Sequence, residues 1–168
     1  MDYIKFQTES ILLLSASITL CMVQRWLCIT TRANNEVTRK KQIWGVAKRY
    51  VAIISKVQKG DTLLMYTRQE SIDNEAIPSA VTGIYQAVSE VYEDNNPLFV
   101  TPRGLGNEVF PLRITLKQVK IFAEPIVFKP LVPEMSFIKN KVMWSGSIRT
   151  AMRVIPEEDY QKILEVAK

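Results

Sequence analysis

Two tryptophans of this chain stand in short segments that combine an aromatic ring with basic residues. Trp44 is followed by Gly45 in a short connection, and Trp144 lies shortly after Phe137 and Ile138. An indole has a broad π-face, so a tryptophan held in a loop can serve as a stacking platform for a nucleic-acid base. The alternative for each ring is a place at the edge of the core.

Both tryptophans lie in segments that contain basic residues and no acidic one. The basic residues are Arg39, Lys40, Lys41, Lys48, Arg49, Lys56 and Lys59 in the first segment, and Lys139, Lys141, Arg149 and Arg153 in the second. Phosphate neutralisation beside aromatic rings is what the binding of single strands or flipped bases requires. A solvated basic surface is the alternative for each run. The formal net charge of +5 fits a polyanionic partner.

Neutral polar side chains near the two tryptophans could read the edge of a base. Thr30, Thr31, Asn34, Asn35 and Ser145 supply hydrogen-bond donors and acceptors of the kind that fixes a ligand's orientation. Helix capping explains the asparagines equally well.

The composition argues against most catalytic sites. The chain has no histidine, which excludes Ser-His-Asp and Cys-His nucleophile systems and histidine-containing zinc sites. Cys21 and Cys28 lack Cys-x-x-Cys spacing and are predicted to be reduced core residues of a cytoplasmic protein. No acidic pair stands out as general acid and base, and the pair Gly104 and Gly106 lacks the context of a phosphate loop. We therefore expect a binding protein without metal or cofactor.

The start of the chain is predicted to lie outside the domain. The apolar run at residues 11–23 is shorter than the ~20 residues that cross a bilayer. Asp2 and Glu9 and the lack of a cleavage site count against a signal peptide. We expect an N-terminal extension at residues 1–22, a single domain at residues 23–168, and no membrane partner.

Alternating helical and strand patterns predict the elements that position these residues. Strands are expected at residues 25–31, 61–67 and 80–91, and short helices after Asn34 and at residues 48–57. Residues 43–46 are expected to be a connection between the two helices, residues 68–79 a polar loop, and Trp26 a core residue.

The second half of the chain is predicted to be a bent strand, an irregular stretch and a helix. Residues 112–116 alternate strictly, and a bulge near Lys117 and Gln118 would keep one face inward. Pro125, Pro130 and Pro133 oppose regular structure, and a helix is expected after Pro156. The predicted fold class is α+β, a small mixed, mostly antiparallel β-barrel flanked by short α-helices.

An ordered series of motifs over residues 23–168 resembles the EVE domain family. The series comprises Trp26-Leu27, Ile29-Thr30-Thr31, Asn34-Asn35-Glu36, Ile43-Trp44-Gly45-Val46, Gly60-Asp61-Thr62-Leu63-Leu64-Met65-Tyr66, Gly83-Ile84, Val88-Ser89-Glu90, Phe110-Pro111-Leu112-Arg113, Ser136-Phe137-Ile138-Lys139-Asn140-Lys141, Trp144-Ser145-Gly146, Arg149, Met152-Arg153 and Ile155-Pro156-Glu157-Glu158-Asp159. EVE domains are similar to YTH domains, and both belong to the PUA-like group of small barrels.

This resemblance implies an aromatic pocket for one base, flanked by basic residues. The implied pocket contains Thr31, Asn34, Asn35, Trp44, Gly45, Val46, Tyr66, Phe99, Phe137, Ile138 and Trp144. The implied phosphate contacts are Arg32, Lys48, Arg49, Lys139, Lys141 and Arg149. Ala33 and Asn35 depart from the family pattern, which leaves base preference open.

The resemblance and the residues together predict a module that binds RNA or DNA and recognises a base, which can be a modified one. Two alternatives remain open. The same pocket could belong to an enzyme acting on a nucleobase, with Tyr66, Asp61 or a basic residue transferring a proton, or to a small-molecule sensor.

Overall fold

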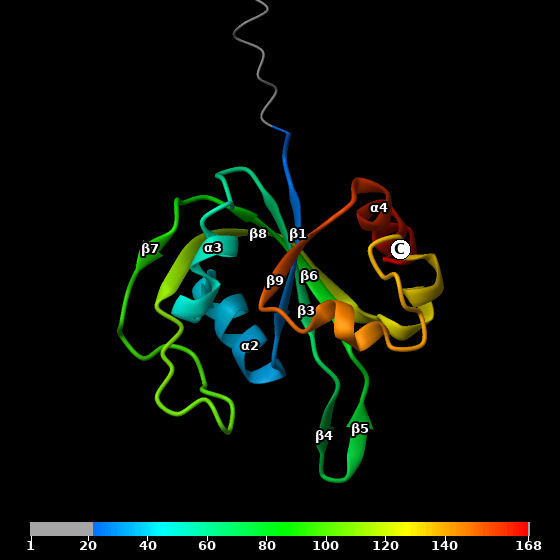
Figure 1. Cartoon of the computed structure of the whole chain (residues 1–168), viewed down its shortest axis with the longest axis horizontal. Coiled ribbons are helices and arrows are strands. Elements are labelled where there is room, and N and C mark those ends of the chain that lie inside the picture. Colours follow the sequence, from blue (N-terminus) through cyan, green and yellow to red (C-terminus); the bar gives the residue numbers. More distant parts are fainter. Residues whose placement is uncertain (1–21, 168) are drawn as a thin grey trace, which may run out of the picture.

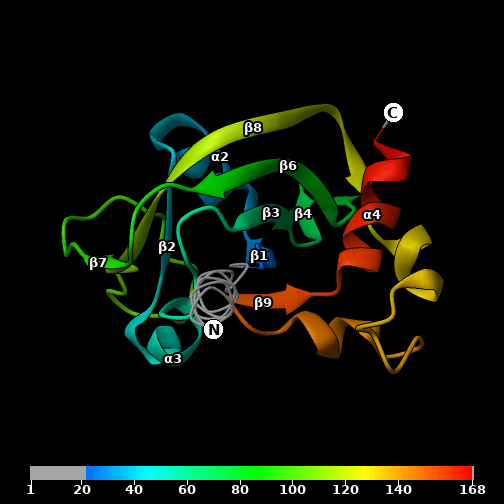
Figure 2. The same cartoon turned by 90° about the horizontal axis from the view of Figure 1, so that it is seen from above.

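The computed structural model describes residues 22–167 and shows a mixed sheet that curls into a half-barrel with short helices around it (Figures 1 and 2). The strands are β1 (Arg25–Thr30), β2 (Ile43–Val46), β3 (Thr62–Thr67), β4 (Glu70–Ile72), β5 (Glu75–Ile77), β6 (Ala80–Ala87), β7 (Tyr92–Glu93), β8 (Leu112–Val127) and β9 (Met152–Ile155). The helices are α2 (Arg32–Lys41), α3 (Val51–Ile54), α4 (Glu157–Val166) and the 3₁₀ helices η1 (Lys48–Tyr50), η2 (Lys129–Glu134) and η3 (Trp144–Ile148).

The main sheet has the order β2-β8-β6-β3-β1-β9, with β7 also paired to β8. Strands β1 and β3 run parallel, and the other pairs are antiparallel. This arrangement confirms the predicted α+β, mostly antiparallel architecture.

Strand β8 is the long curved element that joins the two ends of the half-barrel (Figure 2). Its pairing with β6 is irregular, because Tyr85 faces Gln118 while Ile84 faces Lys120, so Val119 has no opposite residue. The predicted bulge therefore exists, one residue beyond Gln118, and it bends the strand as bulges do.

Pro125 is part of β8, contrary to the expected irregular stretch. Strands β2 and β7 pair with the other end of β8, so none of the described strands is hydrogen-bonded to that edge of β8 at Pro125. A proline, which has no N–H to donate, is tolerated at such an edge.

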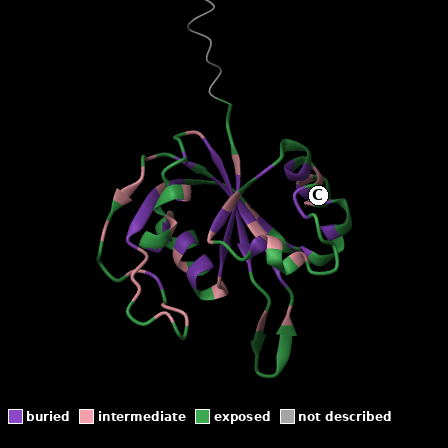
Figure 3. Ribbon diagram, in the orientation of Figure 1, coloured by how far each residue is buried: buried purple, intermediate pink, exposed green. Residues whose placement is uncertain are grey.

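Two hydrophobic clusters fill the interior, and buried residues concentrate along the strands (Figure 3). One cluster packs α4, η2 and η3 against the sheet and contains Tyr66 and Phe128. The other contains Trp26, Trp44 and Met152. Trp26 is fully buried, as the sequence predicts, and its indole Nε1 donates to the carboxylate of Asp61 at 2.9 Å.

Three further predicted elements are wrong in detail. Residues 43–46 form strand β2, paired with β8, and not a connection between helices. Residues 70–77 form the hairpin β4–β5, which projects from the barrel (Figure 1); its turn residues Asp73 and Asn74 both have positive φ, as a tight hairpin turn requires. The helix expected at residues 48–57 is reduced to η1 and α3.

The predicted N-terminal extension lies outside the described residues, apart from Met22, and so does Cys21. Cys28 is buried, and burial raises the pKa of its thiol, which favours the protonated, unreactive form. None of the helices within residues 22–167 has the length and apolar character needed to span a bilayer.

Candidate functional site

A hollow of about 320 Å³ opens where α2, β2 and the loop at residues 94–111 meet. We call it the first hollow. Its size falls in the range of ligand pockets, roughly 300–1,000 Å³. It is lined by Ile29, Thr30, Thr31, Asn34, Trp44, Gly45, Val46, Arg49, Tyr50, Arg68, Phe99, Pro102, Arg103, Leu105, Phe110, Arg149 and Ala151.

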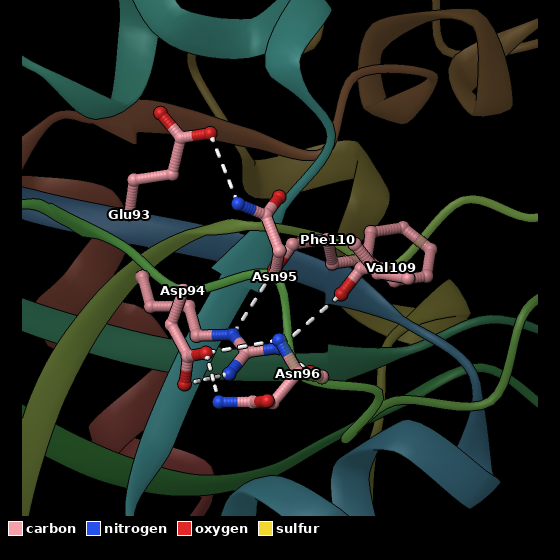
Figure 4. Close-up of polar contacts among 7 residues, drawn as sticks. Glu93, Asp94, Asn95, Asn96, Val109 and Phe110 are labelled. Carbon is pink, nitrogen blue, oxygen red and sulfur yellow. Dashed lines mark hydrogen bonds and ion pairs between the residues drawn. The ribbon is translucent and has the colours of Figure 1, made fainter.

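Arg113 fixes the loop that forms one wall of the first hollow. Its side chain is 1% exposed and pairs with the carboxylate of Asp94 at the start of the loop. The same guanidinium donates to the carbonyl oxygens of Asn96 at 2.5 Å and of Phe110 at 3.2 Å. The Val109 carbonyl oxygen also accepts from it, at 3.4 Å, and Figure 4 shows Asp94, Asn96, Val109 and Phe110 gathered by these bonds. The two ends of the loop are thereby tied together, and Phe99 and Phe110 are presented to the hollow.

Helix α2 holds the middle of the same loop through Asn34. The Asn34 amide nitrogen donates to the carbonyl of Val100 at 2.9 Å, and its oxygen accepts from the Val100 N–H at 2.7 Å. Both ends of this amide are therefore engaged with protein. Thr31 caps α2 by accepting from the Asn34 N–H at 3.2 Å, which leaves its hydroxyl hydrogen free to donate.

Trp44 is part of the core and also borders the first hollow. The residue is 3% exposed and belongs to the cluster of Trp26 and Met152. Its indole Nε1 is buried and has no hydrogen-bond partner among the described residues. The half-buried Tyr50 and the rings of Phe99 and Phe110 complete the aromatic wall; the last two meet edge to face at 5.9 Å.

Gly45 allows Phe99 to pack against the backbone of β2. A Cβ at this position would lie 2.4 Å from Cε2 of Phe99 and 3.1 Å from the carbonyl oxygen of Phe110. A methyl group therefore cannot fit unless the Phe99 ring moves.

The substitution Gly45→Ala is expected to displace Phe99 and reshape the first hollow while the barrel stays folded, because the clash involves a loop and not the sheet. Ligand affinity should fall about tenfold or more, since a displacement near 1 Å disturbs a positioned contact strongly. Titration monitored by tryptophan fluorescence measures the affinity, and Gly146→Ala, where no atom lies within 4 Å of an added Cβ, is the control. Wild-type affinity in Gly45→Ala would show that Phe99 is not part of the site.

The charge around the first hollow is positive. Arg49, Arg68, Arg103 and Arg149 border it, and no Asp or Glu is among its lining residues. The side chains of these arginines form no ion pair and no hydrogen bond with the part of the chain that the structure describes. Arginines without a carboxylate partner around an aromatic hollow favour an anionic, planar ligand.

A second hollow, of about 500 Å³, adjoins the first. It is lined by Tyr66, Arg68, Gln69, Ser79, Trp144, Ser145, Ile148 and Arg149. Arg68 and Arg149 line both hollows.

The structure brings together eight of the residues expected at the site. Thr31, Asn34, Trp44, Gly45, Val46, Arg49, Phe99 and Arg149 all line the first hollow. Tyr66 and Trp144 lie on the second hollow. Asn35 instead accepts from the Thr82 hydroxyl at 3.1 Å, away from both hollows. Phe137 and Ile138 are buried in the core.

Several of the predicted phosphate contacts have protein partners. Lys48 pairs with Glu93 at 2.6 Å and thereby holds the pKa of that carboxyl below its ordinary value. The ammonium group of Lys141 donates to two backbone carbonyls, and Arg32 donates to the carbonyl of Pro78. Lys139 is exposed and lines neither hollow.

Sequence reasoning missed Tyr50, Arg68, Arg103, Phe110 and Arg113. Arg68 and Arg103 fall outside the two acid-free segments, so a search for basic runs cannot find them. Phe110 and Arg113 stand within the recognised motif series, but nothing in the spacing shows that Arg113 ties the loop.

Tyr66 and Asp61, the two proton-transfer candidates named from the sequence, are both buried. Burial raises the pKa of Tyr66, only partly opposed by Ser79 and Arg68, so its hydroxyl stays protonated at neutral pH. The Asp61 carboxylate accepts from Trp26 Nε1 and from the N–H groups of Gln24 and Gln58. Within residues 22–167 no group of His, Cys, Asp and Glu side chains is placed to hold a metal ion.

Comparison with known proteins gives one family and several similar folds. The model of the EVE domain family matches residues 24–166. A UPF0310 protein of Pyrococcus abyssi is 43% identical over 139 residues, which cover 82% of this chain and 95% of that protein.

Solved structures with the same PUA-like fold include two complexes with nucleic acid. Human THYN1 in complex with DNA containing 5-methylcytosine has a TM-score of 0.55 at 12% identity, covering 86% of this chain and 98% of that one. The Mmi1 YTH domain in complex with RNA has a TM-score of 0.59 at 11% identity, covering 86% and 77%.

Proposed function

The chain belongs to the EVE domain family, and on that premise we propose that it binds RNA or DNA by holding one base in the first hollow. The base lies against the aromatic wall of Tyr50, Phe99, Phe110 and the edge of Trp44, while the neighbouring phosphates contact the arginines. The protein acts as a binding module in the cytoplasm, without metal or cofactor.

The observation that carries this proposal is an aromatic hollow bordered by four arginines whose guanidinium groups form no ion pair and no hydrogen bond within residues 22–167; that of Arg49 lies over the Tyr50 ring, 4.9 Å from its centroid. Aromatic rings stack on any base, and guanidinium groups bind phosphate oxygens. A guanidinium group without an anionic partner in the protein binds either water or an external anion. Four such groups around one opening create a positive potential that favours a polyanion.

The free energies agree with a ligand that carries phosphates. Taking a base out of its stack costs a few kcal/mol, and stacking on an aromatic side chain returns ~1–3 kcal/mol. Phosphate contacts must therefore contribute to the net affinity, which makes binding sensitive to salt.

We further propose that a methyl-modified base is preferred. Human THYN1 binds DNA that contains 5-methylcytosine, and the wall of the first hollow is apolar enough to bury a methyl group. Burial of one such group contributes about 0.8 kcal/mol, which corresponds to roughly fourfold tighter binding.

The substitution Arg49→Gln tests the phosphate contact at the first hollow. Binding of short single-stranded RNA and DNA, with and without methylated bases, is measured by fluorescence anisotropy from 50 to 300 mM salt. In Arg49→Gln the slope of log affinity against log salt concentration should be less steep than in wild type by about 0.7, because one phosphate contact is lost. Lys56→Gln is the matched control, because Lys56 is exposed on the same part of the chain and lines neither hollow.

Equal salt slopes for wild type and Arg49→Gln would contradict the phosphate contact. Failure of every oligonucleotide to bind would overturn the proposed function. Appearance of a chemically altered base after incubation would assign the hollow to an enzyme, and salt-independent binding of free nucleosides alone would assign it to a small-molecule sensor.

A further inference from the structure

We propose that the second hollow is a subsite for the nucleotide next to the bound base, with Trp144 as its stacking platform and Arg68 and Arg149 holding the phosphate between the two nucleotides. The inference rests on the proposed function of the first hollow and extends it. It makes the ligand an unpaired segment of at least two nucleotides.

Trp144 is more exposed than the core tryptophans Trp26 and Trp44, as a stacking platform must be. One part of the ring packs near Phe128, with centroids 5.9 Å apart and planes tilted by 44°. The residue is only half-buried, and it lines the second hollow together with Ser145. A large ring anchored on one side and open on the other offers a rigid surface on which a base can stack without a loss of side-chain freedom.

The two hollows meet at a pair of arginines. Arg68 follows the end of β3, and Arg149 follows η3, so the barrel and a separate loop each contribute one guanidinium. Both side chains are exposed and line both hollows. A phosphate that links a base in one hollow to a base in the other would lie between these two cations, which suits a phosphodiester better than an isolated base.

The remaining groups of the second hollow suit a base more than a second anion. Tyr66 and Ser79 bring neutral polar groups, and burial keeps the Tyr66 hydroxyl protonated. Ser145 and Gln69 are exposed at the rim and can donate to or accept from a base edge. A volume of about 500 Å³ accommodates a nucleoside.

Comparison of a nucleoside 5′-monophosphate with the corresponding dinucleotide and trinucleotide tests the subsite. In wild type the second nucleotide should tighten binding by about fivefold to 150-fold, the range expected for one stacked base. Trp144→Ala should remove most of this gain and leave the Kd of the mononucleotide unchanged. Ser145→Glu changes no core contact and should reduce the gain by placing a negative charge at the rim.

Ser55→Glu is the matched control, since Ser55 is exposed and lines neither hollow. Retention of the full dinucleotide gain in both Trp144→Ala and Ser145→Glu would overturn the subsite while the base site of the first hollow stands. Absence of binding of any mononucleotide and any oligonucleotide to wild type would overturn the proposed function, and the subsite with it. Loss of mononucleotide affinity in Ser145→Glu as large as the loss of dinucleotide affinity would also contradict a separate subsite.

Discussion

Replacement of Arg113 by methionine is expected to lower the free energy of unfolding by about 3 kcal/mol and to abolish ligand binding. Methionine fills a similar space but carries no donor. The change leaves the carboxylate of Asp94 and the carbonyl oxygens of Asn96, Val109 and Phe110 without the guanidinium that now binds them.

The expected cost comes mainly from the carbonyl groups. The side chain of Asp94 is 33% exposed and can turn to water, so the loss of its ion pair is partly compensated. The guanidinium itself is 1% exposed, and the groups it joins hold both ends of the loop at residues 94–111. Once these ends separate, Phe99 and Phe110 no longer hold their places at the first hollow, which explains why binding is lost together with stability.

Urea denaturation gives the stability change, and hydrogen exchange gives its location. The N–H of Val100, which Asn34 now binds, should exchange faster in Arg113→Met, whereas the amides of β3 should lose only the protection expected from global destabilisation. Lys48→Met is the control: the Lys48–Glu93 pair is 65% and 46% exposed, so water screens it and its loss should change the stability little. Equal protection of Val100 in wild type and Arg113→Met would contradict the role of Arg113 as the tie of the loop.

Local pattern was sufficient to predict most of the fold. Strands β1, β3 and β6 and helix α4 carry their own periodicity and boundary residues, such as the acidic first turn of α4 after Pro156. Strand β2 was missed because it has only four residues and one of them is glycine. The alternation of apolar and polar side chains is too short there to be detected in the sequence. Its strand character comes from pairing with β8, about seventy residues later in the chain, which is a tertiary effect.

The site was predictable in its composition and not in its geometry. The sequence associated both loop tryptophans with one pocket, whereas the structure places Trp44 at the first hollow and Trp144 at the second. Arg149 lines both hollows, and the separation of residues along the sequence cannot show which of the two hollows each tryptophan ring borders. Likewise Asn34 was expected at a base edge, but the loop backbone at Val100 takes both of its hydrogen bonds.

Trp44 combines a structural role with a proposed binding role, so its simplest substitution is the least informative one. Trp44→Ala removes a ring that is 3% exposed in a packed cluster and should cost roughly 3–5 kcal/mol of stability, with loss of binding. Lost binding in a destabilised protein does not distinguish a wall of the hollow from a core residue. A pair of phenylalanine variants separates the two roles.

Trp44→Phe keeps an aromatic ring and loses no hydrogen bond, because the indole Nε1 has no partner among the described residues. It should therefore destabilise the protein less than Trp26→Phe, which also breaks the bond from Trp26 Nε1 to the buried carboxylate of Asp61, a loss of about 1.5–3 kcal/mol. Affinity should change in the opposite order, since Trp44 borders the first hollow and Trp26 does not. Thermal unfolding and oligonucleotide titration of the two variants measure both quantities. Wild-type affinity in Trp44→Phe, or an equal loss in Trp26→Phe, would show that the indole of Trp44 acts on binding only through the stability of the core.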